Sequence, residues 1–153
     1  MPTPDQSRQN GLALSSDWRR LVGKWASGHH RPFEADTASL TVDVAHPAAQ
    51  RDITLTFTTT SNGLLLLLAT DDRYLADDQI ALAAAAANAW NVERLVPMLS
   101  VCNLGGTARP YLAGVRTMPL ACEMTQPAFQ TMADQWVEDA RALFTWCHKE
   151  CGL

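Results

Sequence analysis

The residues with the most reactive side chains gather near the end of the sequence, in Cys147-His148-Lys149-Glu150-Cys151. In a helix the two cysteines share one face, and paired thiols can bind zinc or act as nucleophiles. A structural zinc site needs four ligands in paired short spacings, and neither Cys122 nor His29-His30 is spaced to complete one. The pattern therefore favours an ordinary helix end, with Cys147 in the core and Cys151 fraying. An enzyme would rest on little more than this pair.

Four aspartates, Asp71, Asp72, Asp77 and Asp78, lie within eight residues. A calcium loop needs ligands at alternate positions, a glycine at its sharp turn and a closing glutamate, and this segment lacks the glycine. Negative charge stabilises the amino-terminal end of a helix. We therefore interpret the aspartates as capping charges of the helix that follows.

The histidines have no nucleophile beside them in the sequence. His29-His30 and His46 read as loop residues, and His148 reads as a cation favoured at the carboxyl end of a helix. The sequence has no GxSxG, HExxH, GxGxxG or glycine-lysine-serine phosphate motif. We expect no catalytic residue, no cofactor-binding residue and no metal ligand.

Composition narrows the functional classes further. The chain has 153 residues and a net charge of -4, with only two lysines and no basic stripe, which argues against a nucleic-acid-binding surface. Its longest strongly apolar run, Leu64 to Ala69, is far shorter than the ~20 residues of a membrane span. The first residues lack the pattern of a signal peptide, so we expect a cytoplasmic protein with reduced cysteines.

Residues 1–14 read as a flexible polar tail, and residues 15–153 as a single domain. Apolar side chains at helical spacing predict a helix that starts at Ser15 or Ser16 and ends at Gly28. Residues that alternate between apolar and polar predict strands around 40–44 and 53–58. Asn62-Gly63 then predicts a hairpin into the strand Leu64 to Ala69, which should be central or covered on both faces.

The second half contains an alanine-rich helix, predicted from Asp77 to Trp90, in which Trp90 anchors the helix and Asn91 ends it. A second hairpin should run from Val96 to Leu104, turn at Gly105-Gly106 and return from Tyr111 to Met118. Pro97 places its first strand at an edge or at a strand start. A long helix from Thr125 to Cys147 closes the chain. The predicted fold is α+β: helix-β-β-β-helix-β-β-helix, with a five-stranded, mainly antiparallel sheet and packed helices.

With this order established, Trp90-Asn91, followed by Arg94, Pro97 and two strands, resembles the YbjN family of bacterial proteins, which are proposed sensory transduction regulators. The resemblance covers about residues 16–148, and its sharp motif is Trp90, Asn91 and Pro97. It implies a fold similar to that of type III secretion chaperones, which are small acidic proteins that dimerise and hold an extended partner segment. Fold alone does not fix function, and the family supplies no catalytic residue to carry over.

We therefore expect a non-enzymatic, chaperone-like binding or regulatory module for a protein or peptide partner, which forms a homodimer. The resemblance implies dimer contacts at the alanine-rich helix and the next strand, near Ala84, Ala87 and Met98. Further candidate partner contacts are Met118 and Trp146, the tryptophan offset from its helix stripe. The alternative is a small-molecule sensor whose pocket, between sheet and helices, is lined by Met98, Met118 and Trp136.

Overall fold

The computed structural model describes residues 11–103 and 109–153, and this part of the chain forms three α-helices and two antiparallel sheets. In chain order the elements are β1 (Leu12–Ala13), α1 (Leu14–Gly28), β2 (Phe33–Ala35), β3 (Ser39–His46), the 3₁₀ helix η1 (Pro47–Ala49), β4 (Arg51–Thr59), β5 (Leu64–Thr70), the 3₁₀ helix η2 (Asp77–Gln79), α2 (Ile80–Arg94), β6 (Met98–Cys102), β7 (Tyr111–Pro119), β8 (Glu123–Met124) and α3 (Gln126–Lys149). The main sheet has the order β2-β3-β4-β5-β7-β6, and β1 pairs with β8. The predicted α+β class is confirmed. The main sheet contains one strand more than expected, the short β2.

Strand β5 lies in the middle of the main sheet, between β4 and β7. Gly63 makes the turn before it with a φ of 81°, a conformation that glycine adopts without steric cost. Leu65, Leu67 and Ala69 are buried, whereas the alternate residues Leu64, Leu66 and Leu68 are half-buried. The strand is therefore central, as predicted, but only one of its faces is fully covered.

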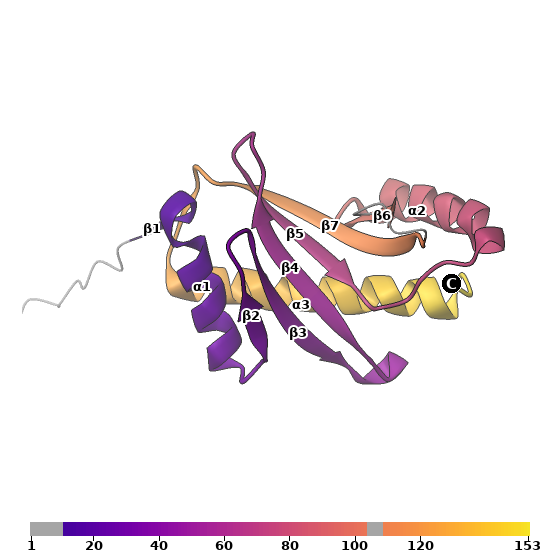
Figure 1. Cartoon of the computed structure of the whole chain (residues 1–153), viewed down its shortest axis with the longest axis horizontal. Coiled ribbons are helices and arrows are strands. Elements are labelled where there is room, and N and C mark those ends of the chain that lie inside the picture. Colours follow the sequence, from indigo (N-terminus) through magenta and orange to yellow (C-terminus); the bar gives the residue numbers. More distant parts are fainter. Residues whose placement is uncertain (1–10, 104–108) are drawn as a thin grey trace, which may run out of the picture.

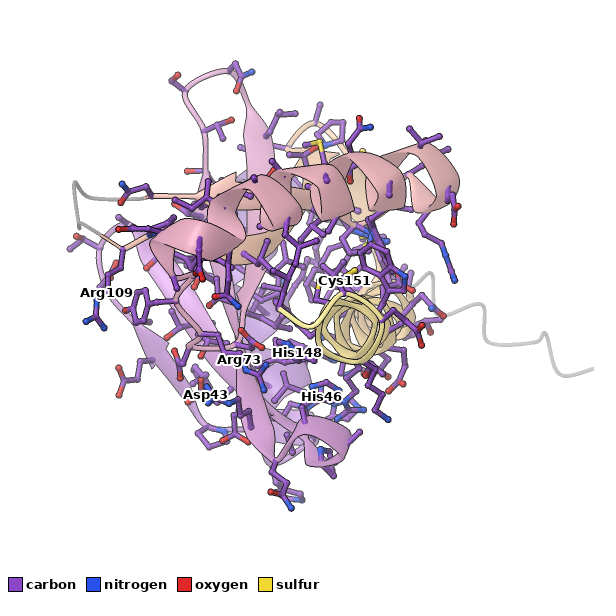
Figure 2. The ribbon with its side chains drawn as sticks, turned by 90° about the vertical axis from the view of Figure 1, so that its right-hand side faces the viewer. Asp43, His46, Arg73, Arg109, His148 and Cys151 are labelled. Carbon is purple, nitrogen blue, oxygen red and sulfur yellow. The ribbon has the colours of Figure 1, made fainter. Side chains whose placement is uncertain are left out.

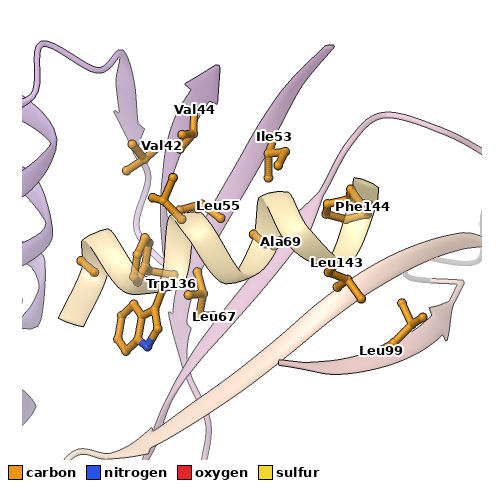
Figure 3. Close-up of a cluster of buried hydrophobic side chains, with 14 of the residues drawn as sticks. Val42, Val44, Ile53, Leu55, Leu67, Ala69, Leu99, Trp136, Leu143 and Phe144 are labelled. Carbon is orange, nitrogen blue, oxygen red and sulfur yellow. The ribbon is translucent and has the colours of Figure 1, made fainter. Parts of the chain in front are cut away.

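Helices α1 and α3 cover the buried face of the sheet, and α3 runs across most of its strands (Figure 1). Figure 3 shows the side chains of α3, among them Trp136 and Phe144, packed against the apolar side chains of β3, β4 and β5. Thr125 caps α3, because its hydroxyl accepts a hydrogen bond from the Ala128 N–H at 3.2 Å. The last helix therefore begins at the predicted cap, and its predicted apolar stripe packs against the sheet.

Residues 12–14, which the sequence assigned to a flexible tail, are already part of the fold. Leu12 and Ala13 pair with β8, and Leu14, the first residue of α1, is completely buried. The Leu14 N–H donates to the Cys122 carbonyl at 3.0 Å. Residues 12–15 are thus fixed by the turn after β7 and by β8, a contact between distant segments that local sequence patterns do not reveal. Residues 1–10 lie outside the described part.

Helix α2 continues to Arg94, one turn beyond the predicted end. It crosses over α3 (Figure 2), and the rings of Trp90 and Trp146 lie 5.2 Å apart where the two helices meet. The predicted turn at Gly105-Gly106 falls outside the described residues. None of the helices in the described part has both the length and the hydropathy that a bilayer crossing demands.

Candidate functional site

The pair Trp90-Asn91 fastens α2 to the strand that follows it. The indole N–H of Trp90, a buried residue, donates to the Pro97 carbonyl at 2.8 Å. The Asn91 side chain makes two hydrogen bonds to Leu99: its amide nitrogen donates to the Leu99 carbonyl at 2.9 Å, and its oxygen accepts from the Leu99 N–H at 2.7 Å. The three predicted motif residues, Trp90, Asn91 and Pro97, are therefore brought together as one structural unit.

This geometry corrects the interpretation of Asn91 as the residue that ends the helix. A carboxamide presents one donor and one acceptor side by side, as a peptide group does, so Asn91 can pair with a strand as another strand would. β6 is the edge strand of the sheet, and its Leu99 main-chain groups are bonded to Asn91 instead of being left open. Asn91 thus covers the sheet edge at Leu99, and α2 remains helical at Asn91 and beyond.

The connection from α2 to β6 is a strained turn. Leu95 has a φ of 64° and a ψ of -42°, and the Val96 N–H donates to the Arg94 carbonyl at 2.7 Å. These values describe a γ-turn with positive φ at its centre, which is rare and unfavourable for a residue with a side chain. Leu95 is nevertheless 73% exposed. Burial of its side chain therefore does not compensate for the strain within this chain.

A set of exposed apolar residues, with the exposed Asn88 among them, lies on α2 and in this turn, and we call it the α2 surface. Its members are exposed and lie on the outward side of α2 or just after it: Ala81, Leu82, Ala84, Ala85, Ala89, Val92, Leu95, Val96 and Met98. The opposite side of the helix, which includes Ala83, Ala86 and Trp90, packs into the core. Isolated exposed apolar residues are common, whereas groups of them are typical of interaction surfaces.

The predicted partner contacts fall into two groups. Ala84 and Met98 belong to the α2 surface. Ala87 lies on the inner side of α2 in the core, and Met118 and Trp146 are partly buried against that core. Ala87 offers a partner little surface, and Met118 and Trp146 lie outside the α2 surface, so we build the proposed contact on Ala84 and Met98.

A second site, which sequence reasoning missed, joins the segment after β5 to the end of α3. His148 Nε2 lies 2.5 Å from a carboxylate oxygen of the buried Asp71, and His148 Nδ1 lies 2.5 Å from the Leu153 main-chain oxygen. Arg73 Nη1 donates to the same Leu153 oxygen at 3.0 Å. Asp71 is therefore a core partner of His148 and not a helix-capping charge. The sequence position of Asp71 could have indicated this role, because Asp71 lies six residues before η2, too far away to cap it.

His46 also differs from its interpretation as a loop residue. It is the last residue of β3 and is buried, and its Nε2 lies 3.0 Å from the Thr145 hydroxyl of α3. Burial is the main cause that lowers the pKa of His46, and the nearby positive charge of Arg141 adds to it. The side chain is therefore neutral in the folded protein at neutral pH.

Two of these groups have their reactive atoms in contact with the protein itself. His148 Nε2 faces the Asp71 carboxylate, and His148 Nδ1 lies beside the Leu153 oxygen and 2.7 Å from Arg73 Nη1. Cys147 is completely buried, and burial raises the pKa of its thiol to about 12, which keeps it protonated. Among residues 11–103 and 109–153, no three His, Cys, Asp or Glu side chains gather in a way that could hold a metal ion.

The pocket that the sequence predicted between sheet and helices is filled by aromatic side chains. Trp136 packs against Phe57 and Phe129, with ring centroids 6.2 and 6.0 Å apart. Met98 lies on the outer surface instead, and Met118 sits partly buried against the core. The three residues proposed to line that pocket therefore differ in position: Trp136 lies in the core, Met118 at its margin and Met98 on the surface.

No protein-family model matches this sequence, and no curated protein matches it either. Among solved structures, the crystal structure of YbjN from E. coli, described as a proposed transcription regulator, superposes on it with a TM-score of 0.67. The match covers 86% of this chain and 92% of that chain, at 12% sequence identity. A likeness at this identity shows the fold alone. The chain therefore has a YbjN-like α+β fold.

Proposed function

We propose that this chain is a non-enzymatic binding and regulatory module that holds a protein or peptide partner on the α2 surface. The observation that carries the proposal is Leu95, an apolar residue held outward on a γ-turn with positive φ. Val92, one helical turn earlier, is equally exposed. Strained backbone conformations cost about 1–3 kcal/mol and concentrate at functional positions. A glycine would avoid this cost, so a leucine here points to a contact made by its side chain.

The chemistry of the surface favours a partner made of protein. It is formed by alanine, leucine, valine and methionine, and it has no cluster of basic residues that could bind phosphates. Small alanine side chains allow close approach of a second backbone, and the adjacent methionine adapts its shape to different partners. The resemblance to chaperones that hold extended segments supports the same function, as an analogy of fold.

A second copy of this chain is the partner that we propose first. A two-fold dimer would place the α2 surface of one copy against that of the other, and each copy would cover the other's Leu95 and Val92. A stable dimer would bury on the order of 1,200–2,000 Å² in total. Such an interface would remove from water the side chains that are most exposed in the single chain.

Sedimentation velocity on purified protein tests this proposal. The wild type should sediment as a dimer, and Ala84→Glu and Val92→Glu should each give a monomer, because an unpaired charge in an interface is costly. Ala142→Glu is the matched control, since Ala142 is an exposed alanine of α3 outside the α2 surface. A wild type that remains a 16.7 kDa monomer at about 1 mM would refute the homodimer.

Replacement of Leu95 by glycine separates function from stability. Leu95→Gly should raise the free energy of unfolding of the single chain by about 1 kcal/mol, because glycine adopts positive φ without strain. It should weaken self-association at the same time, because the apolar side chain is lost. Denaturant titration at low concentration and sedimentation at high concentration measure the two effects. A variant that associates as well as the wild type would contradict the role of Leu95.

A further inference from the structure

A cavity of about 570 Å³ opens beside the Asp71–His148 pair, at the end of the molecule seen in Figure 2. Its walls come from the start of β4, the segment after β5, the start of β7 and the chain after α3. Its charged and polar lining includes Arg51, Asp71, Asp72, Arg73, Arg109 and His148. Ligand sites in proteins have volumes of about 300–1,000 Å³. The cavity is therefore large enough for a small organic molecule.

Arginine side chains dominate the charge of this cavity. Arg51, Arg73 and Arg109 face two carboxylates, and one of these, Asp71, is already bonded to His148. The side chains of Arg51 and Arg109 make no hydrogen bond or ion pair with any residue that the structure describes. Elsewhere, four arginines each lie within ion-pair distance of a carboxylate: Arg20, Arg31, Arg116 and Arg141. In a chain with a net charge of -4, this is a local excess of positive charge.

The protein holds Arg73 in place before any ligand arrives, whereas Arg51 and Arg109 are exposed at the mouth of the cavity. Arg73 is anchored through Nη1 to the Leu153 oxygen at 3.0 Å, and its Nε is buried without a partner among the described residues. The Leu75 N–H donates to the Pro110 carbonyl at 2.7 Å, which keeps the segment that carries Arg109 beside the segment that carries Arg73. The Arg73 guanidinium, fixed in this way, loses little conformational entropy when it binds an anion, and Arg51 and Arg109 add positive charge beside it.

We propose that this cavity binds a small organic anion through a carboxylate or phosphate group held by Arg51, Arg73 and Arg109. Planar guanidinium groups match the geometry of both oxyanions and form charge-assisted hydrogen bonds with them. Leu75, Leu112 and the exposed ring of Tyr74 supply apolar surface for the rest of the ligand. A neutral or cationic ligand would leave the arginines without partners. This site is independent of the α2 surface and goes beyond the proposed binding of a protein partner.

Calorimetric titration of the full chain at low ionic strength tests the proposal, with citrate as the carboxylate probe and AMP as the phosphate probe. At least one probe should bind with a dissociation constant below about 1 mM. Arg51→Gln and Arg109→Gln should each weaken that binding about tenfold, the loss of one charge-assisted contact. Arg20→Gln, which removes the same charge from an exposed position on α1, should change it less than about twofold.

The two probes also identify the chemistry of the ligand. Binding of citrate alone would assign the site to carboxylates, binding of AMP alone would assign it to phosphates, and either result supports the proposal. No binding of either probe up to about 10 mM would overturn it. An equal loss in Arg20→Gln and Arg109→Gln would overturn it as well, because the effect would then come from net charge and not from the cavity.

Discussion

Asn91→Ala tests whether the Asn91 side chain satisfies the main-chain hydrogen bonds of an edge strand, as a neighbouring strand would. The substitution removes two hydrogen bonds, at 2.9 and 2.7 Å, and leaves the N–H and carbonyl of the buried Leu99 without partners. An unpaired buried polar group costs about 1–3 kcal/mol. The higher helix propensity of alanine offsets about 0.6 kcal/mol of this loss in stability. We therefore expect a loss of about 2–4 kcal/mol in the free energy of unfolding.

Asn88→Ala is the matched control, since Asn88 is an exposed asparagine of the same helix. It should leave stability unchanged or raise it by up to about 0.7 kcal/mol, through helix propensity alone. Denaturant titration gives the difference between the two variants. If Asn91→Ala costs less than about 0.5 kcal/mol relative to Asn88→Ala, then water or another group satisfies Leu99 and our reasoning is wrong.

Hydrogen exchange at the Leu99 amide adds a local test of the same interaction. Asn91→Asp keeps the oxygen that accepts from the Leu99 N–H but loses the donor to the Leu99 carbonyl. The Leu99 amide should therefore stay protected in Asn91→Asp and exchange faster in Asn91→Ala. Equal exchange rates in the two variants would contradict this assignment.

Three further predictions concern the core and its chemistry. Trp90→Ala should lower the free energy of unfolding by about 3–5 kcal/mol, measured by denaturant titration. Trp90→Phe, which loses mainly the hydrogen bond to the Pro97 carbonyl, should lower it by about 1–3 kcal/mol. A loss below about 1 kcal/mol in Trp90→Ala would contradict the buried position of the ring. Because burial lowers the pKa of His46, the unfolded chain takes up a proton below about pH 6.5 that the folded chain does not, so the free energy of unfolding should fall on acidification. His46→Gln should make this fall smaller between about pH 7 and pH 5, and identical slopes would disprove the link. A strong chelator should leave the melting temperature unchanged, and stoichiometric zinc in elemental analysis would overturn the predicted absence of a structural metal.

Elements with a clear local pattern could be predicted from the sequence. The period of two in β4 and the Asn62-Gly63 turn identified the β4–β5 hairpin, and the Thr125 cap identified the start of α3. In each case residues close in sequence determine the structure. Strand β2 was missed because three exposed residues carry no periodic signal, and its partner β3 alone defines it as a strand.

The polar contacts between distant segments could not be predicted in this way. Asn91 looked like a helix terminator because asparagine tolerates positive φ, but its amide is used by a strand eight residues later. His148 and Asp71 are 77 positions apart, and neither lies in a pattern that points to the other. Such pairs depend on how α3 lies against the sheet, which a single sequence leaves open.

The strand order also has a consequence for the order of folding. β3, β4 and β5 pair with their neighbours in the chain through short turns, whereas β7 reaches β5 only after residues 71–110, which include α2 and β6. Closing the shorter loops costs less entropy, so we expect the segment of residues 33–70 to assemble first and β7 to dock on it later. Among the described strands, β6 pairs with β7 alone, and α2 is hydrogen-bonded to β6 and to the residue before it, so we expect this unit to open at a lower free energy than the rest of the sheet. A partner bound to the α2 surface would then stabilise the part of the molecule that opens most readily. Binding of that partner would be measured as slower hydrogen exchange in β6.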